Sequence, residues 1–469
     1  MGCDSETLQA WVAESAERLA VPGVSVGVYH DGAEHRAVWG VTSVENPLPV
    51  DDDTLFQFGS TGKTFTATAI MRLVAEGRVA LDATVRTYLP ELRLQDESVA
   101  RDVTVLQLLN HTAGWAGDVF DSTGDGDDAL ARYVEKMADV DQVTPLGASV
   151  SYNNASLSVA GRVIERVTGT TFERAIAQLI FEPLELEHCF FFPNDIMTRR
   201  FAAGHSQHAD GTISVTRPWA LARNANPAGG ISSNAGDLIS WARFHLGDGR
   251  GSDGREILPE QLLRRMQQPT VDTPGSALGD AVGISWMLRD VEGVRMVSHG
   301  GDTLGQHSSF AMVPEHHFAV TGLTNCGPNG SQFLDELGRW ALEAYLGIVE
   351  RDPEPLALSA DELAGYAGTY ETIAATALIV VDGGGLALTA TIKPETLAKL
   401  VAAGDEPPED SPPFPIGILP GPGDRYIVTD GPAKGMKGYF VRTADGAVES
   451  VHVGGRLATR VTEASDDAR

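Results

Sequence analysis

The stretch FGSTGKTF, residues 58–65, contains residues that could form either a phosphate-binding loop or a serine nucleophile with its base. Gly62-Lys63-Thr64 resembles the end of a phosphate-binding loop, whereas Ser60 and Lys63 have the spacing of a nucleophile and its base. A phosphate-binding loop also needs a glycine five residues before Gly62, and that position is Gln57. The pattern therefore favours Ser60 as a nucleophile.

The three-residue step from Ser60 to Lys63 suits a helix that begins near the serine, because both side chains then share one face. The N–H groups and positive potential at the start of such a helix favour a developing anion. A serine hydroxyl becomes a good nucleophile when a base removes its proton, and a desolvated lysine with a lowered pKa can be that base. The apolar residues of the segment 61–77 recur along one face and predict this helix.

A rival serine occurs in Gly23-Val24-Ser25-Val26-Gly27, which matches a nucleophile motif that requires a sharp turn from strand to helix. Ser25 instead lies in an alternating strand that continues to a tight turn at Asp31-Gly32. We therefore expect a hairpin here, after a helix over residues 5–20, and no catalytic role for Ser25.

Two further stretches contain residues that suit a catalytic cleft. Tyr152 and Asn154 lie just before a predicted helix, where a phenol can point into a cleft and an amide offers both a donor and an acceptor. His299-Gly300-Gly301 lies at the end of a predicted strand, where paired glycines allow a substrate backbone to approach closely.

In this order, Ser-x-x-Lys, Tyr-x-Asn and His-Gly-Gly resemble the signatures of the serine β-lactamase and penicillin-binding-protein superfamily. Three more segments carry the same resemblance: HTAG at 111–114, AGGISS at 228–233 and GISW at 283–286, the last being similar to a strand of the family. The resemblance covers roughly residues 20–345. It is strongest to the branch of class C β-lactamases, family VIII esterases, DD-peptidases and D-aminopeptidases.

The resemblance implies an α+β fold of the β-lactamase/transpeptidase type, with an antiparallel sheet flanked by helices and an all-helical subdomain at roughly 85–225. We expect residues 311–325 to form one strand and 332–347 a helix. After the proline-bearing link at 352–355 the sequence changes to short strands with Gly and Asp turns. This change predicts a catalytic domain over 1–350 and a separate small all-β domain over 356–469. The resemblance to a subset of the superfamily implies that this second domain is a lipocalin-like β-barrel.

The resemblance also implies a serine hydrolase that cleaves a small ester or amide through an acyl-enzyme on Ser60, as a carboxylesterase or a D-amino-acid-type peptidase. Lys63 and Tyr152 would share the proton transfer, and Asn154 would orient Lys63 and the substrate. The oxyanion hole would be formed by the backbone N–H groups of Ser60 and Asp302.

His299, with Gly300 and Gly301, would line the pocket at the position where class C β-lactamases have a lysine. A histidine is largely uncharged at neutral pH, whereas a fixed cation there helps to bind the carboxylate of a β-lactam. We therefore expect weak cephalosporin hydrolysis. A β-lactamase, a penicillin-binding protein, or a catalytically silent homologue that binds acyl compounds are the alternatives.

The composition of the chain indicates which partners, location and cofactors to expect. A net charge of −29 on 469 residues argues against nucleic acids and anionic membranes as partners. The resemblance implies a small ester, amide or short peptide as the substrate. The N-terminus does not resemble a secretory signal and no apolar run could span a bilayer, so a cytoplasmic location is expected. Cys3, Cys189 and Cys326 form no metal or redox motif, and the chemistry requires no cofactor or metal. The oligomeric state stays open.

Overall fold

The computed structural model describes residues 4–402 and 413–461. The chain divides into two compact units, which are described separately below. Unit 1 consists of residues 1–149, 153–271 and 282–350, and unit 2 consists of residues 150–152, 272–281 and the chain from Arg351 onward. Cys3 and the proline-rich residues 405–412 lie outside the described residues. The predicted domain boundaries at 350 and 356 stay a proposal.

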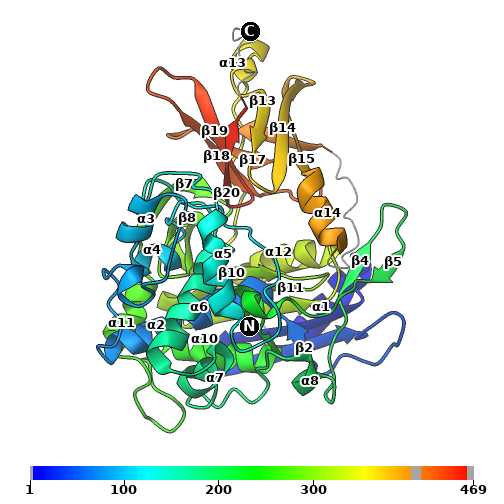
Figure 1. Ribbon diagram of the computed structural model, residues 1–469. Helices are drawn as coiled ribbons and strands as arrows, with labels where there is room; N and C mark the ends of the chain where they lie inside the picture. The colour runs from blue at the N-terminus through cyan, green and yellow to red at the C-terminus, as the bar shows by residue number, and fades with distance from the viewer. Residues whose placement is uncertain (1–3, 403–412, 462–469) are drawn as a thin grey trace. The chain divides into compact units, whose positions relative to one another are not determined.

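An eight-stranded sheet has the order β2-β1-β12-β11-β10-β9-β8-β7, so that β1 from the start of the chain lies beside β12. Strands β2, β10 and β11 of this sheet are labelled in Figure 1. The pairs from β2 to β9 in this order are antiparallel. The strands are β1 (Gly23–His30), β2 (Ala33–Gly40), β7 (Val271–Ser276), β8 (Gly279–Val282), β9 (Met287–Val291), β10 (Val294–Asp302), β11 (His307–Val313) and β12 (Phe318–Thr324).

The predicted hairpin at the start of the chain is confirmed. Asp31 and Gly32 both have positive φ, 48° and 88°, as a two-residue turn between strands of right-handed twist requires. Ser25 lies within β1 and is only 1% exposed. Its backbone is that of a regular strand paired on both sides, so it lacks the turn that would present a nucleophile.

Two strand predictions are wrong. The expected single strand over 311–325 is a hairpin, because a 3-10 turn over Pro314–His316 and the left-handed His317 (φ 44°) reverse the chain between β11 and β12. The segment 283–286 is not a strand but the connection between β8 and β9. Within it, Ser285 has a φ of 57° and its backbone N–H donates to Leu109 O at 2.9 Å.

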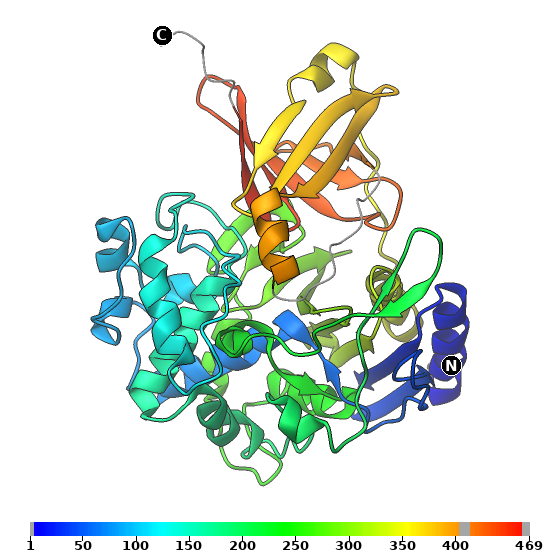
Figure 2. The same ribbon diagram turned by 45° about the vertical axis from the view of Figure 1, so that its right-hand side comes forward.

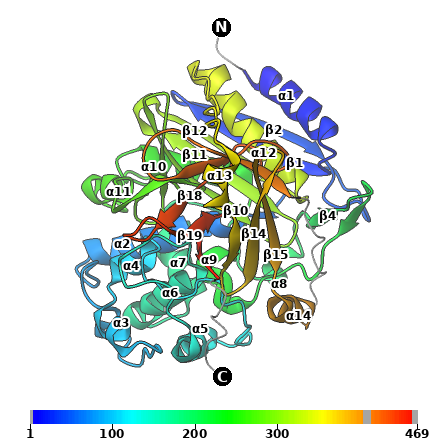
Figure 3. The same cartoon turned by 90° about the horizontal axis from the view of Figure 1, so that it is seen from above.

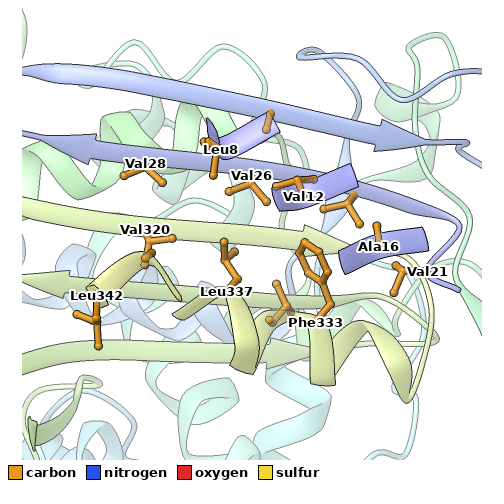
Figure 4. Packing of buried hydrophobic residues seen from close by; sticks show 14 of the residues in the cluster. Leu8, Val12, Ala16, Val21, Val26, Val28, Val320, Phe333, Leu337 and Leu342 are labelled. Carbon is orange, nitrogen blue, oxygen red and sulfur yellow. The ribbon is translucent and has the colours of Figure 1, made fainter. Parts of the chain in front are cut away.

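Helices α1 (Ser5–Arg18) and α12 (Asn329–Ala341) lie side by side on one face of the sheet (Figure 3). Figure 4 shows the apolar residues of both helices packed onto β1 and β12. Trp11 and Trp340 stack between the helices, with ring centroids 4.8 Å apart. On β1, a Cβ placed at Gly27 would lie 2.6 Å from Ile239, because helix α10 (Ala235–Leu246) packs directly on this strand.

The other helices of unit 1 lie around the sheet, most of them on the side where the chain is coloured from blue through cyan to green (Figure 2). They are α2 (Gly62–Ala75), α3 (Glu97–Asp102), α4 (Val105–Leu109), α5 (Ala129–Lys136), α6 (Asn154–Thr168), α7 (Phe172–Ile176), α8 (Pro193–Ile196), α9 (Asn226–Gly229) and α11 (Glu260–Met266). Helix α6 packs against α2, α5 and α9. The region predicted as mainly helical also contains a hairpin that the prediction omitted, β4 (His205–Gln207) and β5 (Ile213–Val215). Two short strands, β3 (Phe56–Gln57) and β6 (Ser232–Ser233), pair with each other.

Unit 2 contains a closed antiparallel barrel of eight strands in chain order, which confirms the predicted all-β barrel. The strands are β13 (Gly368–Glu371), β14 (Ala375–Asp382), β15 (Gly385–Ile392), β16 (Phe414–Ile418), β17 (Arg425–Val428), β18 (Lys437–Arg442), β19 (Val448–Val453) and β20 (Arg456–Arg460). Short helices α13 (Ala360–Ala364) and α14 (Pro394–Ala402) accompany them. Tyr370, Tyr426 and Phe440 are buried in its core. No described helix in either unit has the length and apolar character needed to cross a bilayer.

Candidate active site

Ser60 and Lys63 lie where β3 passes into α2. Gly59 has a φ of 57° and opens a 3-10 turn, Gly59–Thr61, that continues directly into the helix. Lys63 is fully buried, and its Nζ donates to Ser60 Oγ at 2.9 Å and to Ala228 O at 2.7 Å. The line from Oγ to Nζ is short enough for the hydroxyl proton to pass to the amine when that amine is neutral.

The packing of helix α9 explains why the segment at residues 228–230 consists of small residues, Ala-Gly-Gly. It packs against α2, where Thr66 Oγ1 donates to Pro227 O at 2.8 Å, and it presents Ala228 O to the lysine. A Cβ at Gly229 would lie 3.0 Å from the backbone of Gly59. The small residues therefore let α9 approach the serine turn closely enough to fix the Lys63 side chain.

Hydrogen bonds join the serine turn to the central strands β10 and β11. Thr61 Oγ1 donates to His299 O at 3.3 Å and lies 2.9 Å from Ser308 Oγ. Ser308 Oγ donates to Phe58 O at 2.7 Å. All of these groups are buried, so the contacts hold the turn in register with the end of β10.

The end of β10 touches the serine turn through two glycines. A Cβ at Gly301 would lie 2.0 Å from Phe58 O and 2.6 Å from the backbone N of Ser60. A Cβ at Gly59 would lie 2.7 Å from the backbone N of Asp302. The backbone nitrogens of Ser60 and Asp302 therefore both lie at the close contact between the serine turn and the end of β10. Their role as an oxyanion hole stays a prediction.

His299 lies on β10 and is 1% exposed. Burial, and next the charge of Lys63, lower the pKa of its imidazole to about 3. Its Nδ1 donates to Gly300 O at 2.6 Å, which fixes the neutral tautomer. His299 therefore supplies no cation at the pH at which most enzymes work.

Beside this strand end is a carboxylate that the sequence analysis assigned no side-chain role. The Asp302 side chain is 74% exposed, and its Oδ1 lies 2.5 Å from His307 Nδ1 on β11. The register of β10 and β11 sets this pair, since Asp302 and His307 are direct partners across the two strands. No motif predicts the pair; only the register could have.

Asn154 is the first residue of α6, and its Nδ2 donates to Asp118 Oδ1 at 2.8 Å. The preceding Asn153, which the sequence analysis did not select, is 1% exposed and caps the helix by accepting from Ser156 N at 2.8 Å. Its Nδ2 donates to Trp115 O, also at 2.8 Å. The start of α6 is thereby held rigidly in unit 1, while the predicted contact of Asn154 with Lys63 stays a prediction.

Tyr152 belongs to unit 2, where it lies beside the turn between β19 and β20. Its backbone N–H donates to Gly455 O at 2.8 Å, and the guanidinium of Arg456 lies 5.1 Å from the centre of its ring. Sequence reasoning missed Arg456, and only the Gly454-Gly455 turn before it marked the position. The role of Tyr152 beside Ser60 stays a prediction.

Comparison with known proteins gives a consistent result. Residues 8–345 match the Beta-lactamase family. Penicillin-binding protein 4 of Amycolatopsis lactamdurans is 36% identical over 359 residues, which cover 75% of this chain and 93% of that protein. Esterase EstB of Burkholderia gladioli is 36% identical over 190 residues, which cover 37% of this chain and 48% of the esterase.

Among solved structures, the crystal structure of SurE aligns with a TM-score of 0.76 at 25% identity and covers 97% of this chain and 99% of SurE. A second structure, of SurE with D-Leu, aligns with a TM-score of 0.74. The chain therefore belongs to the Beta-lactamase family. Its relatives are serine hydrolases of the β-lactamase, penicillin-binding-protein and esterase type, and in this chain a β-barrel follows the matched region.

Proposed function

We propose that the protein is a hydrolase of small esters or amides, either a carboxylesterase or a D-amino-acid-type peptidase, which works through an acyl-enzyme on Ser60. The observation that carries the proposal is the 2.9 Å contact between Ser60 Oγ and the fully buried amine of Lys63. A buried amine in direct contact with a serine at the start of a helix is suited to activating that serine.

In the proposed reaction, Ser60 Oγ attacks the carbonyl carbon while its proton passes to Lys63, with Tyr152 sharing the transfer. The negative charge that forms on the carbonyl oxygen is stabilised by the backbone N–H groups of Ser60 and Asp302. The intermediate collapses to the acyl-enzyme, and the departing alcohol or amine takes up the proton. Water then attacks the acyl-enzyme by the same route, which regenerates Ser60 and releases the acid.

The neutral state of His299 supports esters and amides over β-lactams as substrates, because no fixed cation is available at this position to bind a carboxylate. The full-length similarity to SurE, which has been solved with D-Leu, supports D-aminoacyl compounds as one class to test. We propose a small ester, amide or short peptide as the partner, and the charge of −29 argues against a nucleic acid.

The test combines labelling with substrate profiling. The protein would be treated with a fluorescent phosphonate and assayed on p-nitrophenyl esters of increasing chain length, on D- and L-leucine p-nitroanilides and on a chromogenic cephalosporin. Ser60→Ala should lose both labelling and turnover. Ser25→Ala is the matched control, since it removes a serine hydroxyl from a buried strand and should leave the enzyme folded and active. An adduct on Ser25 would overturn the assignment, and a wild-type protein with neither label nor turnover would be a silent homologue.

A further inference from the structure

A second pocket, separate from the serine site, lies at the C-terminal end of α6. Its volume is about 860 Å³, and four arginines line it against two carboxylates, Asp127 and Glu165. Arg166 is twelve residues along α6 from Asn154, which corresponds to roughly 18 Å of helix. The pocket is formed entirely by unit 1 and has no part in the proposed acyl transfer.

Two of the arginines are fixed in the wall of the pocket by buried carboxylates. Arg162 Nη1 donates to Glu165 at 2.8 Å, and Arg223 Nε donates to Glu173 at 3.1 Å. Glu165 and Glu173 are 7% and 8% exposed, so each carboxylate is almost fully removed from water. Glu165 also accepts from the backbone N–H of Phe172 at 3.1 Å. These bonds join α6 to α7 and make the wall a rigid structure.

The other two arginines, Arg166 and Arg174, are exposed, and within residues 4–402 and 413–461 neither side chain has a hydrogen-bond acceptor or an ion-pair partner. Arg162 and Arg166 are four residues apart on one helix face, a spacing at which like charges destabilise a helix. The chain has 64 acidic residues against 35 lysines and arginines, so carboxylates to neutralise a guanidinium are abundant. The positive charge of this pocket therefore contrasts with the net negative charge of the whole chain.

Neutral groups complete the lining. Thr171 precedes α7, but its side chain does not cap that helix, so its hydroxyl remains available to a bound oxygen. The half-buried ring of Phe192 also lines the pocket and has the Arg223 guanidinium 5.2 Å from its centre. Guanidinium groups and a hydroxyl can donate hydrogen bonds to the oxygens of a phosphate ester, and an aromatic ring can pack against the apolar part of that ester.

We propose that this pocket binds a phosphate monoester, whose phosphoryl oxygens contact Arg166 and Arg174 and whose organic part packs on Phe192. A phosphate monoester carries close to two negative charges above its second pKa of about 6, whereas a carboxylate carries one. An excess of arginines with free forks favours the dianion over the monoanion. The proposal is independent of the acyl-transfer chemistry at Ser60.

Isothermal titration of the full chain at pH 8 in a low-chloride buffer, with phenyl phosphate as the probe, tests the proposal. We expect binding by the wild type, weaker binding of inorganic phosphate, which lacks the ring, and the weakest binding by benzoate. Arg166→Ala and Arg174→Ala should each weaken phenyl phosphate binding roughly tenfold, the usual range for a lost charge-assisted hydrogen bond. Ser60→Ala should leave the affinity unchanged, which distinguishes this pocket from the serine site.

Arg265→Ala is the matched control, because Arg265 is an exposed arginine on α11 that does not line the pocket. It should alter the affinity less than twofold, and ester hydrolysis should be unchanged in all three arginine variants. Equal losses in Arg265→Ala would show a general effect of net charge and overturn the site. Benzoate binding as tight as phenyl phosphate would overturn the phosphate class, and so would the absence of any heat of binding at millimolar probe.

Discussion

Gly301 packs closely against the serine turn in the candidate site, and replacing Gly301 by alanine tests whether this contact matters. The added Cβ would lie 2.0 Å from Phe58 O and 2.6 Å from Ser60 N, whereas ordinary contacts begin at 3.4 Å. The strand and the turn must therefore separate by about 1 Å or more, and a misplacement of that size costs about a hundredfold in rate. The loss of one oxyanion donor has a similar effect, about 10²–10³ in kcat.

We therefore expect Gly301→Ala to lower kcat for p-nitrophenyl butyrate by about 10²–10³ and to slow phosphonate labelling in parallel. The overpacking should also lower the stability by about 1–3 kcal/mol, visible as a lower Tm. Gly338→Ala on α12 is the control for an added methyl group, since nothing lies within 4 Å of its Cβ, and it should keep full activity. If Gly301→Ala kept its kcat within threefold and its Tm unchanged, the close approach would have no role in positioning the oxyanion donors.

Three further predictions concern the proton path, the substrate and acid stability. Lys63→Ala and Tyr152→Phe should each slow acylation by about 10²–10⁴, and fully multiplicative losses in the double variant would show that the two residues do not share a proton path. Cephalosporin kcat/KM should fall below that of the best short ester, and His299→Lys should raise it relative to the ester; a cephalosporin as the best wild-type substrate would replace the present proposal. His245 and His299 are buried, and burial is the main cause that lowers the pKa of each imidazole to about 3. Below pH 6.5 the unfolded chain therefore binds more protons than the folded chain. The folded state should lose about 1.4 kcal/mol of stability per pH unit for each histidine as the pH falls from 6.5 towards 3. Urea unfolding at pH 7.5, 6 and 5 measures this loss, and equal stabilities at the three pH values would contradict it.

Local patterns predicted the elements whose signal lies in adjacent residues. The hairpin turn at Asp31-Gly32 was predicted because the positive φ of such a turn favours an Asp-Gly pair. The helix after Ser60 was predicted because its apolar residues recur with the period of a helix. The strand over 311–325 was predicted wrongly because its alternation continues across the reversal at Pro314 and His317. Periodicity could not distinguish one long strand from two strands that share a short turn.

The non-local parts of the site could not be predicted in the same way. One acceptor for Lys63 is a backbone carbonyl, Ala228 O, and a motif of residue types cannot identify a backbone carbonyl. The pairing of Asp302 with His307 depends on the register of two strands. The sequence could not show that Asn153 is the residue that caps α6, because asparagine suits both capping and catalysis. Where two asparagines follow each other, only the geometry of the helix start decides which of them is the cap.

The complete burial of Lys63 has a practical consequence for handling the protein. The chain has only six lysines, and Lys393, Lys399, Lys434 and Lys437 all belong to unit 2. Amine-directed dyes, biotin esters and aldehyde supports cannot reach the Lys63 amine from solvent, so they should attach mainly to unit 2 and leave the serine site intact. Conjugation through lysine is therefore a route to tethering this protein without modifying Lys63.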